Sequence, residues 1–264
     1  SGTSSEISLG LGAPVSGAPL TLASLKTLGL TASVLSDKFG SASWTADDWG
    51  ATLSAADMAP ISWIQGPVMS SWIVMKPMGS DLHLTAWLEI RLWATGDVEV
   101  LPWVENGYLL KESPNAREAT YSFTLGGRQR FSMLLPMFHH TRMPLVAGSA
   151  LSYWAGDDKS TVPQHDRRYL YSTGLVQTYM STVERNYPAF EPGRNDAGSV
   201  PSTFVPFEPH NNYQNTSHPT AMGSGGGHWS IGIQPAWEAV ALVDCSALAF
   251  EQMIRESYRF GVYQ

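Results

Sequence analysis

The residues of this sequence that could do chemistry are concentrated in its last third. The segment from His210 to Tyr213 reads HNNY, and the segment 218–229 reads HPTAMGSGGGHW, ending in His228 and Trp229. Imidazole, amide and phenol groups are the set that β-elimination from a uronate polysaccharide requires. One group neutralises the sugar carboxylate, a base removes the proton beside it, and an acid protonates the leaving oxygen. The sequence therefore favours a site of this kind on a glycine-rich loop, whose glycines turn the backbone and present His228.

Each of these residues has a role in that hypothesis. His228 or Tyr213 is the base or the acid, and His210 is a third catalytic candidate. The substrate-binding candidates, which would hold the carboxylate or contact the sugar, are Asn212, Arg168, His165, Trp229, Trp87 and Trp103. A simpler interpretation stays open, in which Asn and Gly make turns and the histidines are half-buried beside local hydrogen-bond partners.

Other common chemistries lack their sequence patterns. No zinc motif such as H-E-x-x-H is present, and the adjacent His139 and His140 would point to opposite faces if they lay on a strand. There is no G-x-S-x-G nucleophile motif, and the single cysteine, Cys245, lies in an apolar helical context. The carboxylates that a glycoside hydrolase would use in pairs are Glu89, Glu105, Glu208 and Glu238. We therefore expect no metal and no required cofactor, although the sequence leaves room for a calcium ion.

A β-hairpin with three tryptophans is the clearest structural signal in the chain. Apolar and mixed residues alternate along 84–104, which predicts two strands with one face in a core. A three-residue loop at 95–97 would keep the apolar sets together by pairing Leu92 with Val100. The other face then carries Trp87, Trp93 and Trp103. That face is either a second core covered by helices or by another sheet, or an exposed platform on which sugar rings stack.

The remaining strand signals predict an antiparallel β-sandwich over residues 1–155. The stretch 66–77 reads as one strand, and a second hairpin follows in 120–135. A three-residue loop at Gly126 to Arg128 would place Phe123 opposite Phe131. For residues 1–60 the pattern favours strands and loops. Two successive antiparallel hairpins with alternating faces are typical of a sandwich.

Helical patterns return in the second part of the chain, residues 156–264. They cover 167–185, 236–244 and 246–264, and a long stretch rich in Pro, Gly and Asn, 188–234, lies between the first two. These helices cannot bury their apolar faces as an independent bundle, so we expect them to pack on the sheets or on segments outside this sequence. The fold class is therefore mainly β with α: an antiparallel β-sandwich followed by a helical segment packed on it.

The composition of the chain limits the classes of binding partner that we expect. The 264 residues carry a net charge of −7 and contain no long run of Lys or Arg, which argues against nucleic acid and anionic membrane surfaces. No apolar stretch approaches the length of about 20 residues that crosses a bilayer. No signal peptide is visible, and the first residues, which lack an initiator Met, read like a trimmed or internal beginning. The ten tryptophans beside 24 glycines are typical of proteins that bind sugars, because a pyranose stacks on indole.

Three stretches resemble a known group of proteins. They read GPVMSSWIVMKP…HLTAWLEIRLWATGDVEVLPWVENGY, HDRRYLYSTGLVQTYM and AMGSGGGHWSIGIQPAWEAVAL. In the kinds of residues they contain and in their order along residues 60–262, they resemble uncharacterised bacterial and phage-encoded proteins. Those proteins look related to polysaccharide lyases with a β-sandwich and an α/α-barrel. The resemblance implies that the chain is a fragment of a larger protein of that architecture.

We therefore expect the chain to engage a polysaccharide or cell-surface glycan, and to cleave it by β-elimination if it is an enzyme. The expected location is extracellular, at the cell surface or in a virion. Two alternatives stay open. One is a structural or receptor-binding protein of a virion, with copies of itself or virion proteins as neighbours. The other is a carbohydrate-binding module without catalysis.

Overall fold

The structure, a computed structural model, consists mostly of antiparallel β-sheet. It describes residues 12–13, 15–49, 60–79, 83–108, 116–147 and 150–159, and seven single residues beyond them: Tyr169, Ser172, Thr173, Leu242, Phe250, Met253 and Ile254. One four-residue helix, α1 (Ser24–Thr27), precedes the strands in the described part of the chain.

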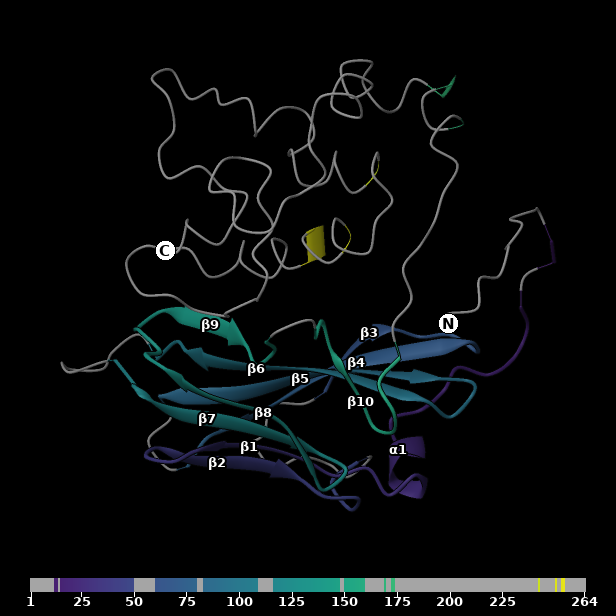
Figure 1. The fold of residues 1–264 in the computed structure, drawn as a ribbon. Coiled ribbons are helices and arrows are strands. Elements are labelled where there is room, and N and C mark those ends of the chain that lie inside the picture. The colour runs from purple at the N-terminus through teal and green to yellow at the C-terminus, as the bar shows by residue number, and fades with distance from the viewer. Residues whose placement is uncertain are drawn as a thin grey trace.

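Four strands form the first sheet, in the order β2-β1-β7-β8. Their bounds are Ala32–Ser36 for β1, Gly40–Trp44 for β2, Ala119–Leu125 for β7 and Arg128–Leu135 for β8. Each neighbouring pair is antiparallel. The sheet therefore brings the N-terminal hairpin beside a hairpin from the middle of the chain, and it lies as one layer below the second sheet in Figure 1.

Six strands form the second sheet, in the order β10-β6-β5-β4-β3, with β9 also paired to β6. Their bounds are Ile61–Ile64 for β3, Met69–Pro77 for β4, Leu84–Trp93 for β5, Val98–Asn106 for β6, Thr141–Pro144 for β9 and Tyr153–Trp154 for β10. The strand expected within 66–77 is thus β4. The short strands β9 and β10 share one edge of β6, since β10 pairs at residues 99–100 and β9 at 103–106.

Pro102 lies in the gap between these two short strands. A proline has no N–H to give to a neighbouring strand, so it is tolerated at a strand edge or a bulge. Here the Pro102 carbonyl accepts a hydrogen bond from the Leu145 N–H, 2.8 Å away, just after β9 ends. The two short strands therefore leave β6 without a regular partner on this side at Pro102.

The alternation of side chains along β5 is as predicted. Every even-numbered residue from Leu84 to Leu92 is buried, and every odd-numbered residue from Thr85 to Trp93 is half-buried. The predicted pairing was wrong by two residues, because Leu92 faces Val98 rather than Val100. The loop has three residues, as expected, but it comprises Ala94 to Gly96, and the Trp93 N–H donates to the Asp97 carbonyl.

In the second hairpin, Phe123 pairs with Phe131, as predicted, and Tyr121 pairs with Met133. The turn is shorter than predicted. Leu125 pairs with Arg128 across a two-residue turn, and a register shift follows between Phe123 and Thr124. Gly126 and Gly127 both have positive φ, 57° and 78°, which two-residue hairpin turns require.

The two sheets share one hydrophobic core. It combines Val34, Trp44, Tyr121 and Phe123 of the first sheet with Leu88, Ile90, Val100 and Val104 of the second. Residues of β5 and β6 that face away from this core form the outer face of the six-stranded sheet. That face carries the three tryptophans predicted to lie together.

Six of the seven single residues described beyond Lys159 have helical backbone: Tyr169, Ser172, Leu242, Phe250, Met253 and Ile254. They fall within the three ranges where the sequence predicts helices. The extent of those helices lies outside the described residues.

Candidate functional site

Most of the residues predicted to do chemistry lie outside the described part of the chain. These are His228, Tyr213, His210, Asn212, Arg168, His165 and Trp229. Trp87 and Trp103 are described, and they pair directly across β5 and β6. The prediction that these two indoles share a face is therefore confirmed, and the site is built from them.

An arginine lies against both indole rings. Arg142 is on β9 and pairs with Glu105, two residues along β6 from Trp103. Its guanidinium carbon is 4.5 Å from the ring centroid of Trp87 and 4.8 Å from that of Trp103. Both distances are within the roughly 6 Å at which a cation is attracted to the face of an aromatic ring. We call Trp87, Trp103 and Arg142 the arginine–indole stack.

The charge of Arg142 is not neutralised by a bonded partner. Its guanidinium makes no hydrogen bond or ion pair within the described part of the chain, and its Nε is buried without an acceptor there. Burial lowers the pKa of Arg142, and the charges of Glu105 and Glu89 offset only part of this effect. The side chain stays cationic, because an arginine is not deprotonated in proteins. The stack therefore holds a cation whose hydrogen-bonding capacity is not used by the residues that the structure describes.

Two neighbouring carboxylates explain why Arg142 keeps this capacity. Glu105 is turned towards Gly107: a Cβ placed on that glycine would lie 2.6 Å from the Glu105 Oε1. Glu89 is occupied by Arg91, which donates from Nε at 2.9 Å and from one terminal nitrogen at 2.7 Å. Neither carboxylate reaches ion-pair distance of Arg142.

Arg91 provides the contrast on the same face. Besides Glu89, it contacts Glu99 at 3.3 Å, and Glu99 also accepts a 2.6 Å hydrogen bond from Ser152. Burial would lower the pKa of Arg91, but the charges of Glu89 and Glu99 outweigh it and raise this pKa. Arg91 is thus paired with two carboxylates, while Arg142 has no such partner among the described residues.

Three histidines lie at the end of the sheet where β9 begins. His83, just before β5, is buried, and its Nδ1 is 2.7 Å from the Asn106 Oδ1. The ring of His139 is 6.0 Å from that of His83 and 3.7 Å from that of His140. We call His83, His139 and His140 the histidine cluster. It adjoins the arginine–indole stack, because only Thr141 separates His140 from Arg142.

Hydrogen bonds fix the protonated nitrogens of two of these rings. Asn106 donates from its amide nitrogen to the Met137 carbonyl at 3.0 Å, so its amide oxygen faces His83 and accepts from Nδ1. The Nε2 of His139 donates to the Tyr108 carbonyl, 2.7 Å away. His140 has φ of +64°, so the pair forms a turn with stacked rings instead of the opposed strand positions considered from the sequence.

The described residues do not form a metal centre, since no three His, Cys, Asp or Glu side chains among them converge as metal ligands would. No helix within the described ranges has the length and apolar character needed to span a bilayer.

Sequence reasoning gave no role to Arg142, Asn106 or His83. Arg142 reaches the two tryptophans because β9 pairs with β6, and that pairing joins segments about forty positions apart in the chain. The local cue that could have found it is a single cation within the short segment TRMP, directly after two histidines.

No protein-family model matches this chain, no curated protein matches it, and no solved structure matches it. The resemblance to polysaccharide lyases therefore stays a prediction from the sequence, and the functional argument rests on the geometry of the described residues.

Proposed function

We propose that this protein binds an acidic polysaccharide, and that Arg142 pairs with a carboxylate of the sugar. The observation that carries this proposal is the arginine–indole stack, in which a half-buried guanidinium is held by two aromatic rings without a bonded anion in the described part of the chain. A guanidinium presents parallel N–H donors that match a carboxylate.

The stack also orients the guanidinium before a ligand arrives. Contact with Trp87 and Trp103 limits the rotamers of Arg142, so less side-chain entropy is lost on binding. Apolar indole edges beside the cation suit the C–H faces of a pyranose. A uronate unit combines these two features, a carboxylate and an apolar ring face.

We infer further that the two sheets are a β-sandwich that carries a helical segment, and that the protein acts outside the cell, at a cell surface or in a virion. Cleavage of the polysaccharide by β-elimination is part of this proposal. The half-buried His139 and His140, three and two residues before Arg142 in the chain, supply imidazole groups, and the exposed Tyr108 supplies a phenol of the kind that the reaction uses. The catalytic candidates His228, Tyr213 and His210 stay predictions.

Affinity measurements on the full chain test the binding proposal. Polygalacturonate, alginate and hyaluronan are titrated beside the neutral polymer dextran, and binding is followed by calorimetry. We expect at least one acidic polymer to bind and dextran not to bind. Arg142→Met should weaken binding about tenfold or more, as expected for the loss of a charge-assisted hydrogen bond.

Arg128→Met is the matched control, because it removes the same charge from an exposed position on β8 of the other sheet. Equal affinities of the two variants would place the binding site elsewhere. Failure of every acidic polymer to bind would overturn the proposed function. Cleavage is read separately, from the ultraviolet absorbance of unsaturated uronates, and a flat trace with a bound polymer would leave a binding protein without lyase activity.

One observation favours a second function, assembly with neighbouring subunits. All four residues of β3 are exposed although three are large and apolar: Ile61 is 45%, Trp63 68% and Ile64 43% exposed. An apolar edge strand is a surface on which another chain can add. Light scattering would show a defined assembly, and Trp63→Lys should dissociate it; a monomer at all concentrations would reject this role.

A further inference from the structure

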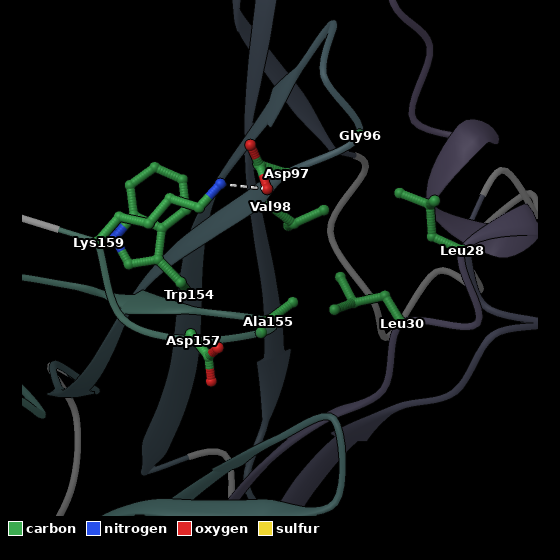
Figure 2. A pocket seen from close by; sticks show the side chains of 10 residues that line it. Leu28, Leu30, Gly96, Asp97, Val98, Trp154, Ala155, Asp157 and Lys159 are labelled. Atoms are coloured by element: carbon green, nitrogen blue, oxygen red, sulfur yellow. Dashed lines mark ion pairs between the residues drawn. The ribbon is translucent and has the colours of Figure 1, made fainter.

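A cleft at the opposite end of the six-stranded sheet has the features of a second, independent ligand site. Its volume is about 300 Å³. Three segments line it: the residues after α1, the turn between β5 and β6, and the chain from β10 onward. Figure 2 shows Leu28 and Leu30 on one side of the cleft, with Trp154 and Lys159 across from them.

The floor and one wall of the cleft are apolar. Leu30 and Val98 belong to the core, and their buried side chains close the bottom. Leu28 is 49% exposed, so it offers apolar surface to the open side. Trp154 is half-buried on β10 and provides an aromatic ring. An apolar floor beside an indole wall can accommodate the C–H face of a sugar ring.

A fixed pair of charges forms the rim. Lys159 makes an ion pair with Asp97, drawn as the dashed line in Figure 2. Its Nζ also lies 5.4 Å from the ring centroid of Trp154. The other carboxylate oxygen of Asp97 accepts a hydrogen bond from the Thr95 hydroxyl at 2.7 Å. These two hydrogen bonds, first that from Lys159, hold the pKa of Asp97 below its ordinary value.

The rim therefore offers an acceptor and a donor side by side. Asp97 stays ionised at neutral pH, and its oxygens keep free lone pairs after the bonds to Lys159 and Thr95. Lys159 has three N–H donors and uses one on Asp97. Two adjacent hydroxyl groups of a sugar can meet both residues, one by donating to the carboxylate and one by accepting from the ammonium group.

The charge balance decides between a neutral and an acidic sugar. Asp157 also lines the cleft, so the lining carries two carboxylates and one ammonium group. The one cation of the lining is already paired, in contrast to Arg142. The two carboxylates would repel a ligand carboxylate, whereas they would not repel uncharged hydroxyl groups.

We propose that this cleft binds one neutral pyranose unit, with the ring against Trp154 and Leu28 and two hydroxyls on Asp97 and Lys159. The inference does not depend on the proposed function, because it uses other residues and another sugar class. Since the ligand is small, the expected Kd for a monosaccharide is about millimolar.

Indole N–H signals in ¹⁵N-labelled full-length protein test this inference. The Trp154 signal is identified by its loss in Trp154→Phe. Methyl glycosides of glucose, galactose, mannose and N-acetylglucosamine are the probes, and glycerol and methyl glucuronide are the controls. We expect at least one neutral glycoside to shift the Trp154 signal in a saturable way, and neither control to do so.

Asp97→Ala should abolish the shift, while Asp47→Ala, a change of an 88% exposed carboxylate elsewhere, should preserve it. Leu28→Glu is a second blocking variant, because position 28 is exposed enough to accept a charge without disturbing the core. The inference fails if no neutral glycoside moves the Trp154 signal, if glycerol moves it equally, or if the blocking variants and Asp47→Ala respond alike.

Discussion

The guanidinium carbon of Arg142 lies 4.5 Å from the indole ring of Trp87, although β9 and β5 do not pair with each other. The contact crosses β6, which pairs with both strands and contributes Trp103. A single side chain thus ties a four-residue edge strand to the middle of the sheet. Its energetic value can be measured separately from any ligand.

A double-mutant cycle on Arg142→Ala and Trp87→Ala should give a coupling energy of about 1 kcal/mol, the range of a partly desolvated cation–π pair. Urea unfolding of the wild type, the two single variants and the double variant measures it. Trp93 is the control, because it shares the outer face but does not contact Arg142. Additivity in the Trp87 cycle, within about 0.3 kcal/mol, would show that the contact contributes nothing to stability.

Acid should lower the stability of the fold, partly through protonation of Asp48. Burial alone would raise the pKa of Asp48, but hydrogen bonds from the Thr45 backbone and from Lys76 outweigh it and lower the pKa below 3.8. A carboxyl with a lowered folded pKa stabilises the fold above its unfolded pKa, and that contribution disappears as the pH falls through the folded value.

Asp48→Asn should therefore lower the free energy of unfolding by about 1 kcal/mol at pH 7 and by progressively less below pH 4. Unfolding free energies from pH 7 down to pH 2.5 measure this dependence. Asp47→Asn, in which the carboxylate is far more exposed, should leave the profile of the wild type. An equal loss for Asp48→Asn at pH 7 and pH 2.5 would contradict the assignment.

Alkali should destabilise the fold through Tyr153. Burial raises the pKa of this phenol to about 12, and the Arg130 charge only partly counteracts burial. Because the unfolded phenol ionises near pH 10, the unfolded state gains free energy of ionisation first, and stability falls between about pH 10 and pH 12.

Tyr153→Phe should remove up to about 3 kcal/mol of the free energy of unfolding that the wild type loses between about pH 10 and pH 12. It should also delete one late step from the absorbance titration of tyrosinate. The ring packs on Phe123 with centroids 5.7 Å apart, and phenylalanine preserves this contact. A titration in which every tyrosine of the native protein ionises by pH 10.5 would be incompatible with the assigned pKa.

Two glycines with positive φ should respond differently to alanine. Gly40 has φ of +102°, and a Cβ there would lie 2.9 Å from the Gly79 Cα, a backbone atom that cannot move aside cheaply. Gly96 has φ of +85° but nothing within 4 Å of such a Cβ. Gly96→Ala should cost about 1 kcal/mol from backbone strain alone, and Gly40→Ala about 3 kcal/mol. Thermal unfolding compares the two, and equal costs would refute the steric argument.

The alternation of apolar and polar residues predicts the face of the sheet on which a side chain lies better than it predicts which residues pair between strands. Moving the pairing of β5 and β6 by two residues leaves every side chain on the same face, so the pattern could place Trp87 and Trp103 together but could not distinguish Leu92–Val98 from Leu92–Val100. The turn decides between them. In this hairpin the backbone closes over Ala94 to Gly96, and Gly96, with φ of +85°, supplies the left-handed residue at the third position of the loop.

The site itself was less predictable than the sheet. Arg142 and the histidine cluster come together through the pairing of β9 with β6 and through the His139–His140 turn. Both depend on contacts between segments far apart in sequence, which local patterns do not encode. The cleft beside Trp154 has the same origin, since its lining comes from three separate segments.

The division of the β6 edge between β9 and β10 has a consequence for growth of the sheet. Two short strands interrupted at Pro102 already occupy that side, so a further strand cannot lie along it as a continuous partner. Among the described strands of this sheet, β3 is the edge strand at the end opposite β9 and β10, whose own edges are only four and two residues long. Lateral association through β3 would therefore close on itself as a twofold pair and would not propagate into a fibre.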